Sequence, residues 1–250
     1  MHVLVPSLHT PTPTHHIRYD WSNEALHGIA RDGLATSFPQ ICGVGASGNR
    51  TLWKEIATAI STEGRGKNNG LNGNRHGGLT FWAPNINIVR DPRWGRGEET
   101  PGEDPTLNGD YAEQFVTGMQ GDQSSGYLKV SACLKHYATY NEETDRMGFS
   151  ANVTSQDMED SYLPAFQAGV ERGNASGLMC SYTAMTYGVG VYGTGSTARS
   201  WARSRLARTK GCSPICSVTR GDSMATSPRT VKRCRTFRSS TTTPTAPTRP

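Results

Sequence analysis

The sequence predicts an α/β protein with a parallel sheet, because strand-like and helix-like segments alternate between Trp21 and Tyr182. Three apolar runs are typical of buried strands: residues 79–89, 128–134 and 177–182. The segments between these runs carry apolar side chains at helical spacing. Strand, helix, strand, helix, strand at these lengths favours parallel strands joined by crossover helices.

The first predicted helix covers residues 49–63. Leu52, Ile56 and Ile60 recur at four-residue spacing, so we expect them to share the face that packs on the core. Asn49 is a suitable N-cap, because its side-chain oxygen can accept a free backbone N–H of the first turn.

Two further helices are predicted between the later strands. The first spans residues 106–119, and its apolar stripe consists of Leu107, Tyr111, Phe115 and Met119. The second spans residues 154–173, and its stripe consists of Met158, Tyr162, Phe166 and Val170. We expect Thr154 or Ser155 to cap the start of this helix and Gly173 to end it.

The composition changes sharply after about Gly193. Residues 194–250 hold twelve Lys and Arg side chains and one acid, Asp222, although the whole chain has a net charge of only +5. This segment has no apolar periodicity, so we expect a disordered basic tail. Residues 1–18 are expected to form an unstructured lead, which leaves residues 19–193 as the folded domain.

Several functional classes are disfavoured by the sequence. No run is long and apolar enough to span a membrane, and the first 18 residues lack the pattern of a signal peptide, so no membrane partner is expected. Cys212 and Cys216 have no partners at zinc spacing, so no metal or cofactor is expected. The basic tail lacks interleaved aromatic residues, which argues against a nucleic-acid partner.

Polar side chains recur where the predicted strands end. Arg96 follows the first strand, Lys135 and His136 follow the second, Tyr182 ends the third, and Arg146 lies in the loop after His136. In a barrel such loops share one rim, so these five side chains are predicted to converge. Together they offer many hydrogen-bond donors, which suits a ligand rich in hydroxyl oxygens. For any one of them alone, a salt bridge at the rim is the alternative.

The acidic residues admit simpler interpretations. Glu98, Glu99, Glu103 and Asp104 follow the first strand. We interpret them as a solvated turn that stabilises Arg93 and Arg96. Glu24, taken alone, is typical of a carboxylate on a helix surface or at a helix N-cap.

Six stretches between residues 19 and 189 resemble glycoside hydrolase family 3, and within it the β-xylosidase/α-arabinofuranosidase-like branch. They read YDWSNEALHG, ATSFPQ, AISTEGRG, LTFWAPNINIVRDPRWGRGEETPGEDP, ACLKHYATY and GLMCSYTAMTYGV. The resemblance implies a (β/α)8 TIM-type barrel, of which this chain would hold about five of the eight repeats. It also implies a retaining enzyme that removes terminal β-linked xylose, arabinose or glucose from xylan-type oligosaccharides. Family members are mostly extracellular.

The resemblance also implies a role for six residues. Glu24, Arg96, Lys135, His136, Arg146 and Tyr182 match the family positions that line the subsite for the non-reducing sugar. A retaining glycosidase further needs two carboxylates about 5–5.5 Å apart. In the family the nucleophile is an Asp in a Ser-Asp-Cys or Ser-Asp-Trp motif, and the acid/base is a Glu from beyond the barrel.

This sequence departs from the family at the nucleophile. Neither Ser-Asp-Cys nor Ser-Asp-Trp occurs in it. When codons are shifted by one base, however, residues 220–231 can be read as WGFDGYVTSDC with permitted synonymous codons. We therefore hypothesise a one-base frame change between about Gly188 and Arg220, which places the nucleophile's codon across Arg229 and Thr230.

On this hypothesis the chain contains no catalytic carboxylate, and we expect poor folding and negligible turnover. Two alternatives remain open at this stage. The chain could be a non-catalytic sugar-binding remnant, or an interaction protein that works through its basic tail.

Overall fold

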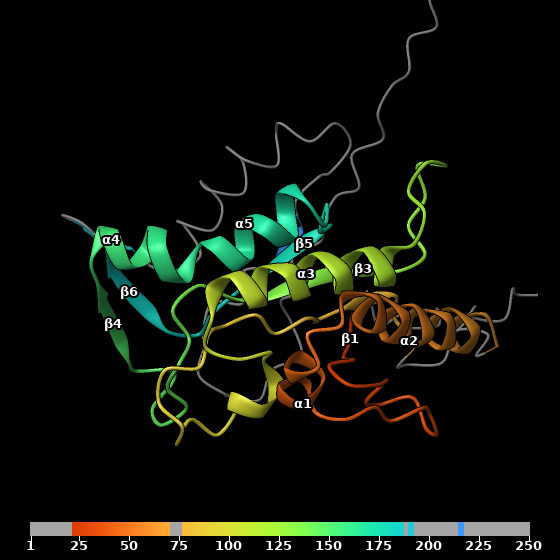
Figure 1. Ribbon diagram of the computed structural model, residues 1–250, viewed down its shortest axis with the longest axis horizontal. Coiled ribbons are helices and arrows are strands. Elements are labelled where there is room, and N and C mark those ends of the chain that lie inside the picture. The colour runs from red at the N-terminus through yellow and green to blue at the C-terminus, as the bar shows by residue number, and fades with distance from the viewer. Residues whose placement is uncertain (1–21, 71–76, 188–189, 193–214, 218–250) are drawn as a thin grey trace, which may run out of the picture.

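The computed structural model describes residues 22–70, 77–187, 190–192 and 215–217. In these residues, five strands form one sheet in the order β1-β2-β3-β5-β8, and every neighbouring pair is parallel (Figure 1). They are β1 (Ser22–Asn23), β2 (Thr80–Phe81), β3 (Ser131–Tyr137), β5 (Gly177–Cys180) and β8 (Ile215–Ser217). Parallel strands that follow chain order and are joined by helices form an α/β fold of the partial-barrel kind, as predicted.

Three further strands form a second, smaller sheet that shares no strand with the first. Its strands are β4 (Ser150–Val153), β6 (Ala184–Tyr187) and β7 (Gly190–Tyr192). β4 and β6 are parallel, whereas β6 and β7 are antiparallel. β4 branches from the connection between β3 and β5, so this connection is more elaborate than a single crossover helix.

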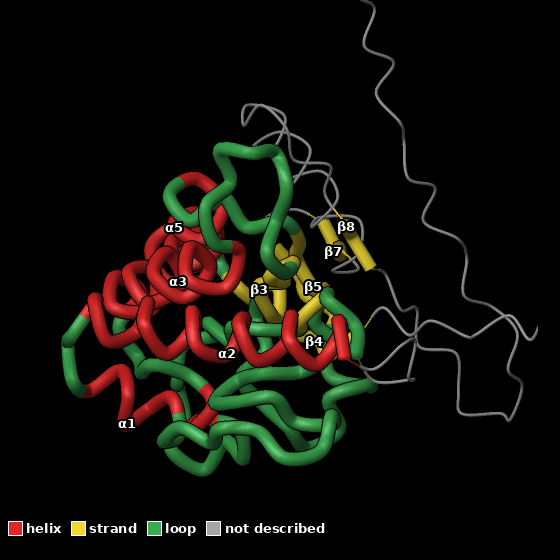
Figure 2. Tube along the Cα trace, turned by 90° about the vertical axis from the view of Figure 1, so that its right-hand side faces the viewer, coloured by secondary structure: helices red, strands yellow, loops and turns green. Residues whose placement is uncertain are grey.

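Helices cover one side of the five-stranded sheet (Figure 2). The long ones are α2 (Arg50–Gly70), α3 (Pro105–Gln120) and α5 (Pro164–Glu171); the short ones are α1 (Ile41–Ala46), α4 (Ser155–Asp157), the 3-10 turn η1 (Gly97–Glu99) and the π-helical turn η2 (Met158–Tyr162). α2 and α3 approach closely at Gly118, where a Cβ atom would lie 2.5 Å from the carbonyl oxygen of Lys54. A glycine is therefore needed for this packing.

The first predicted helix exists, but its buried face differs from the prediction. Ile56 and Ile60 are buried as expected, whereas Leu52 is 37% exposed and Trp53 is buried in its place. The indole Nε1 of Trp53 donates to the carbonyl of Val44, so its polar atom is satisfied inside the core. The N-cap prediction is confirmed, because Asn49 Oδ1 accepts the backbone N–H of Leu52 at 3.1 Å.

Helix α3 forms where its apolar stripe predicted it. Tyr111, Phe115 and Met119 are fully buried, and Leu107 packs against the same core. Asp104 caps the N-terminus by accepting the backbone N–H of Thr106 at 2.7 Å. Pro105 follows at the first helical position, where a missing N–H costs nothing.

The third predicted helix is interrupted. Thr154 caps its start as expected, but the chain runs through α4, η2 and α5 rather than one continuous helix. The break falls at Pro164, which has no N–H to donate and begins a new helix instead. Met158, Phe166 and Val170 nevertheless stay buried, so the predicted stripe survives the interruption.

The strand boundaries also shift. β2 covers only two residues of the predicted 79–89 run, since the chain beyond it is extended but pairs only at isolated points. Pro84 lies there and cannot donate to a sheet ladder. β3 begins and ends about three residues later than predicted, which places Lys135 and His136 inside the strand.

Some expectations fall outside the described residues. The unstructured lead 1–18 is one, and so is nearly all of the predicted disordered tail 194–250. Within that tail the structure describes residues 215–217, which differ from the expectation because they pair with β5 as a strand. Among the helices of the described residues, none combines the length and hydropathy needed to cross a membrane.

Candidate active site

The predicted site residues lie at the carboxyl ends of successive parallel strands. Glu24 directly follows β1, Lys135 and His136 are among the last three residues of β3, and Tyr182 comes two residues after β5. Arg96 directly precedes η1, in the connection between β2 and α3. Because the strands are parallel, these ends share one edge of the sheet, which is where α/β barrels build their sites.

Arg96 is held by a partly buried carboxylate. Its Nη2 atom donates to Glu99 Oε2 at 2.6 Å, and its Nε atom donates to Glu99 at 3.0 Å. The side chains are only 17% and 23% exposed. Burial lowers the pKa of Arg96, but hydrogen bonds and the charge of Glu99 outweigh this, so the net pKa is raised. Asn85 also donates to Glu99, which fixes the carboxylate from a second side.

His136 is a neutral acceptor in this cluster. Arg96 Nη1 lies 3.2 Å from His136 Nε2, and because arginine can only donate, Nε2 must accept. The proton therefore lies on Nδ1, which donates to Asn87 Oδ1 at 3.2 Å. Burial, together with the positive charges of Lys135 and Arg96, holds the pKa of His136 well below its usual range.

Asn87 fixes the backbone around His136. Its Oδ1 atom accepts the backbone N–H of His136 at 2.8 Å, and its Nδ2 atom donates to the carbonyls of His136 and Ala138. Asn87 is itself 2% exposed. A buried amide with all these partners orients the imidazole as firmly as a main-chain contact would.

Lys135 is a nearly buried amine at the centre of the cluster. Burial and the charge of Arg96 lower its pKa to about 8, while Glu24 and Glu99 act in the opposite direction. Its side chain makes no hydrogen bond with the part of the chain that the structure describes. An amine in this state carries its proton at neutral pH and has donors to offer a ligand.

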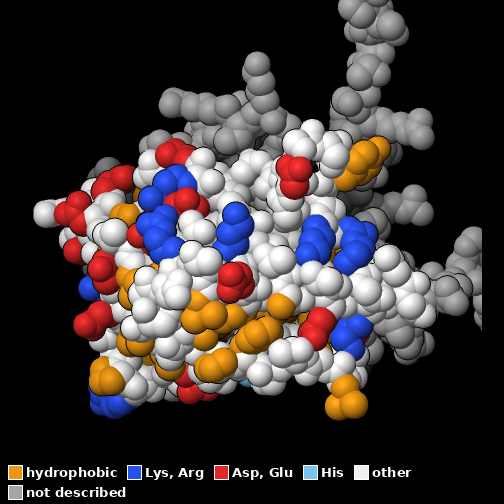
Figure 3. All heavy atoms as spheres, turned by 45° about the vertical axis from the view of Figure 1, so that its right-hand side comes forward, with side chains coloured by type: hydrophobic (Ala, Val, Ile, Leu, Met, Phe, Trp, Pro, Cys, Tyr) orange, Lys and Arg blue, Asp and Glu red, His pale blue; other side chains and the backbone are white. Residues whose placement is uncertain are grey.

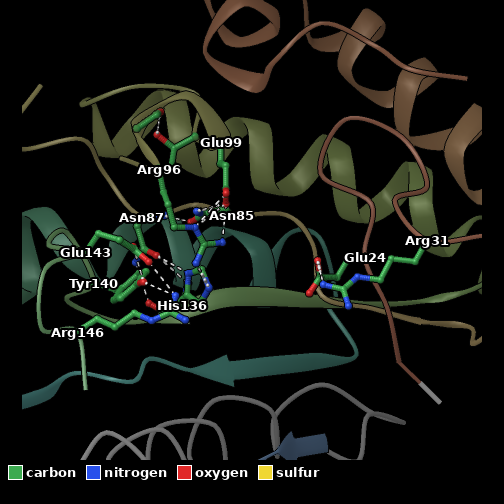
Figure 4. A network of polar contacts seen from close by, with 12 residues as sticks. Glu24, Arg31, Asn85, Asn87, Arg96, Glu99, His136, Tyr140, Glu143 and Arg146 are labelled. Atoms are coloured by element: carbon green, nitrogen blue, oxygen red, sulfur yellow. Dashed lines mark hydrogen bonds and ion pairs between the residues drawn. The ribbon is translucent and has the colours of Figure 1, made fainter. Parts of the chain in front are cut away.

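A group of aromatic rings completes the cluster. Tyr140 is buried, and its ring lies 4.7 Å from that of His136 and 6.1 Å from that of Tyr182. The guanidinium of Arg146 lies 4.6 Å above the Tyr182 ring, at a distance where cation–π attraction is favourable. Arg146 also forms an ion pair of 2.8 Å with Glu143 (Figure 4).

Four of the six predicted residues are therefore joined by direct contacts: Arg96, His136, Arg146 and Tyr182. Lys135 precedes His136 in β3 and interacts electrostatically with Arg96. Glu24 stands apart, since its side chain is 43% exposed and pairs with Arg31 at 3.7 Å (Figure 4). Its carboxylate reaches the cluster only through its effect on the pKa of Lys135.

The prediction for the acidic loop was half right. Glu99 does stabilise Arg96, as described above. Arg93 instead pairs with Asp91 at 2.6 Å, and that pair is exposed to solvent. The loop's other contribution is Asp104, which caps α3.

Sequence reasoning missed four residues of the cluster: Asn85, Asn87, Tyr140 and Glu143. Asn85 and Asn87 alternate with Ile86 and Ile88 in a run that we predicted to be buried. A buried asparagine must find hydrogen-bond partners, so this alternation was an available signal. Tyr140 gave no such signal, because one tyrosine beyond a strand is common.

The chemistry of the cluster is suited to binding a polyhydroxyl ligand. Two guanidinium groups and one ammonium surround a neutral imidazole and aromatic rings, a combination that binds hydroxyl oxygens and the faces of sugar rings. Two carboxylates in contact with the cluster, Glu99 and Glu143, are each paired with an arginine. Within the described ranges, no three His, Cys, Asp or Glu side chains lie where they could hold a metal ion.

The sequence is similar to those of known glycosyl hydrolases. Residues 7–198 match the glycosyl hydrolase family 3 N-terminal domain. Beta-D-xylosidase 1 of Arabidopsis thaliana is 47% identical over 178 residues, covering 66% of this chain and 22% of that protein. A beta-xylosidase/alpha-L-arabinofuranosidase of Medicago sativa subsp. varia is 46% identical, covering 66% and 23%. The chain spans less than a quarter of the length of these relatives.

Solved structures that resemble this chain are also glycosidases. A family 3 exo-beta-xylosidase in complex with a xylobiose aziridine probe is 37% identical with a TM-score of 0.63, covering 67% of this chain and 23% of that one. Beta-glucosidase 3B of Thermotoga neapolitana, in complex with glucose, is 26% identical with a TM-score of 0.63, covering 80% and 27%.

Proposed function

This chain belongs to glycosyl hydrolase family 3, and on that premise we propose that its site binds the terminal, non-reducing sugar of a β-linked, xylan-type oligosaccharide. By family it is an O-glycosyl hydrolase of the β-xylosidase type. Xylose is the first candidate sugar, since relatives at about 45% identity are named for it. Arabinose and glucose are the competitors to test.

One observation carries the proposal. Arg96, Arg146 and Tyr182 come from three separate strand connections and His136 from the end of β3, and the four still contact one another at a single edge of the sheet. Ion pairing alone would need neither the neutral His136 nor the charged Lys135, whose side chain forms no hydrogen bond with the described residues. A ligand with several hydroxyl groups can use both, because a hydroxyl donates and accepts.

We further propose that the chain turns over its sugar at a negligible rate. The family's nucleophile motif does not occur in the sequence, and residues 220–231 yield it only in a shifted reading frame. Neither Glu99 nor Glu143 stands in the Ser-Asp-Cys or Ser-Asp-Trp motif that supplies the nucleophile in the family. Sequencing the transcript between the codons for Gly188 and Arg220 tests the frame hypothesis, which a continuous frame without a Ser-Asp-Cys motif would overturn.

The binding proposal is tested by calorimetric titration of the full chain with xylobiose, xylose, arabinose and glucose. We expect saturable binding of xylobiose and xylose, with weaker binding of glucose. Near-UV circular dichroism establishes that the chain is folded. No heat of binding from a folded chain would contradict the proposal.

Turnover is measured separately with an aryl β-xyloside. We expect release of the aryl group to stay at the level of a buffer blank. A rate that scales with chain concentration would contradict the inactivity proposal and leave the binding proposal intact.

A further inference from the structure

Tyr140 contacts more of the candidate site than any residue predicted from the sequence. Its ring faces His136 at 4.7 Å and Tyr182 at 6.1 Å, and the guanidinium of Arg96 lies 5.6 Å above it. The hydroxyl group accepts from Arg146 Nη1 at 3.2 Å. One side chain therefore touches four of the six predicted sugar-binding residues, from three connections of the sheet.

The hydroxyl of Tyr140 is tied down from both sides. It donates to Glu143 Oε2 at 2.6 Å while it accepts from Arg146, and Arg146 closes the triangle by pairing with Glu143 Oε1 at 2.8 Å. Tyr140 is fully buried, whereas Arg146 is 39% exposed and lies on a loop. A buried phenol anchored in the core thus holds an arginine that would otherwise sample several rotamers.

The surroundings make the phenol a hydrogen-bonding group rather than an ionising one. Burial and the hydrogen bond to Glu143 raise the pKa of Tyr140, so the group keeps its proton across the physiological range. The hydroxyl can therefore donate to Glu143 and accept from Arg146 at the same time.

We propose that Tyr140 is a positioning residue of the sugar site, whose hydroxyl, with Glu143, holds the Arg146 guanidinium over the Tyr182 ring. The effect on sugar affinity rests on the proposed sugar-binding function, whereas the positioning of Arg146 by Tyr140 does not. The sugar would meet an arginine that is already oriented, so less conformational entropy is lost on binding.

A purely structural role is the competing explanation, because the Tyr140 ring also packs on Trp94 at 6.0 Å. Tyr140→Phe separates the two roles, since it keeps the ring and removes only the hydroxyl. Tyr111→Phe is a matched control. Tyr111 is equally buried, in α3, and its hydroxyl has no partner within the described part of the chain.

The first measurement needs no sugar. In the full chain, 15N NMR of arginine side chains reports how fast a guanidinium rotates about its Nε–Cζ bond, and Arg146→Lys identifies the signal. We expect rotation of Arg146 to be at least threefold faster in Tyr140→Phe and unchanged in Tyr111→Phe. Glu143→Ala is the second variant; it removes the acceptor from the partly exposed side and is expected to speed rotation in the same way.

The second measurement is sugar affinity. We expect Tyr140→Phe to weaken xylobiose binding about tenfold, which is typical for the loss of one hydrogen bond to a charged group. Its melting temperature should lie within about 2 °C of that of Tyr111→Phe. Unchanged rotation of Arg146 in Tyr140→Phe would overturn the inference. If the unmodified chain binds no sugar while rotation does change, the proposed function fails and the positioning role stands.

Discussion

Two networks of arginines and carboxylates in this molecule use the same chemistry in different surroundings. On the helices, Asp110 and Glu113 of α3 pair with Arg50 of α2 and with Arg172 directly after α5, at 2.7 to 3.3 Å. At the sheet edge, Arg96 pairs with Glu99 at 2.6 Å and Arg146 with Glu143 at 2.8 Å. The distances are alike, so distance alone does not tell the two networks apart.

The burial of Arg96 and the charge balance distinguish them, although Arg146, at 39% exposed, is nearly as accessible as the arginines of the helix network. Arg50 and Arg172 are nearly half exposed, whereas Arg96 is 17% exposed. The helix network balances two positive against two negative charges. The sheet-edge cluster adds Lys135 to its two balanced pairs, and so retains a surplus cation in a nearly dry place.

This difference shows which network is available to a ligand. A balanced, solvated network links helices and gains little, because water and salt screen it. A buried surplus charge costs stability unless a partner arrives. On the face that Figure 3 shows, basic and acidic side chains intermingle, and neither sign forms a single patch.

The largest effect is expected from Arg96→Met. Loss of this guanidinium leaves Glu99 nearly buried with only Asn85 as a partner, which should lower the free energy of unfolding by about 3 kcal/mol. Xylobiose affinity should fall at least a hundredfold. Urea denaturation and calorimetry measure the two effects.

The double variant Arg96→Met/Glu99→Gln serves as its control. Removing the orphaned charge should restore most of the stability but none of the affinity. Recovery of both would assign Arg96 a structural role only.

Lys135→Met should raise stability while it abolishes binding, whereas Arg96→Met should lower both. Replacing a buried ammonium by an apolar side chain should raise the free energy of unfolding at pH 7 by about 1–2 kcal/mol, while sugar binding is lost. A rise in melting temperature together with a silent calorimetric titration is the expected pair of results.

The pH dependence of stability tests the same residue. The folded pKa of Lys135 is about 8, against an ordinary value of 10.5, so between these values the unfolded chain binds more protons. The contribution of Lys135 to the free energy of unfolding should therefore rise as the pH increases from 8 toward 10. Lys135→Met should lack this part of the rise, and parallel curves for the two proteins would contradict the assignment.

Arg172→Ala tests the helix network. Because Arg172 is 48% exposed, its two ion pairs are screened, and the loss should cost only about 0.5 kcal/mol. Sugar affinity should not change. If Arg172→Ala weakened xylobiose binding as much as Arg96→Met, the contrast between the two networks would be wrong.

Arg93→Ala is expected to have the smallest effect. Arg93 lies three residues from Arg96 in the sequence, yet it pairs with Asp91 in full contact with solvent. Neither the melting temperature nor the sugar affinity should change measurably. A clear loss of affinity would show that Arg93 reaches the ligand.

The sequence alone was enough to predict the elements that depend on local physics. Helix α3 was predicted from its apolar stripe alone, because neighbouring side chains on one helical face decide it; the Asp104 cap, which we had interpreted as part of a solvated turn, was found in the structure. The alternation of strands and helices, and with it the α/β class, follows from the same local periodicity. Family membership was equally readable, because it depends on motifs that are continuous in the sequence.

Only the tertiary structure decided what depends on partners distant in sequence. β3 ends at Tyr137 because β2 and β5 supply its pairing, and this placed Lys135 and His136 inside the strand. Trp53 displaced Leu52 from the core because Val44 offered its indole an acceptor. Arg96 contacts His136, 40 residues away in the sequence, and a buried Tyr140 anchors Arg146. Neither contact has a signature in the local sequence, because hydrogen bonds and burial are determined when separate segments pack together.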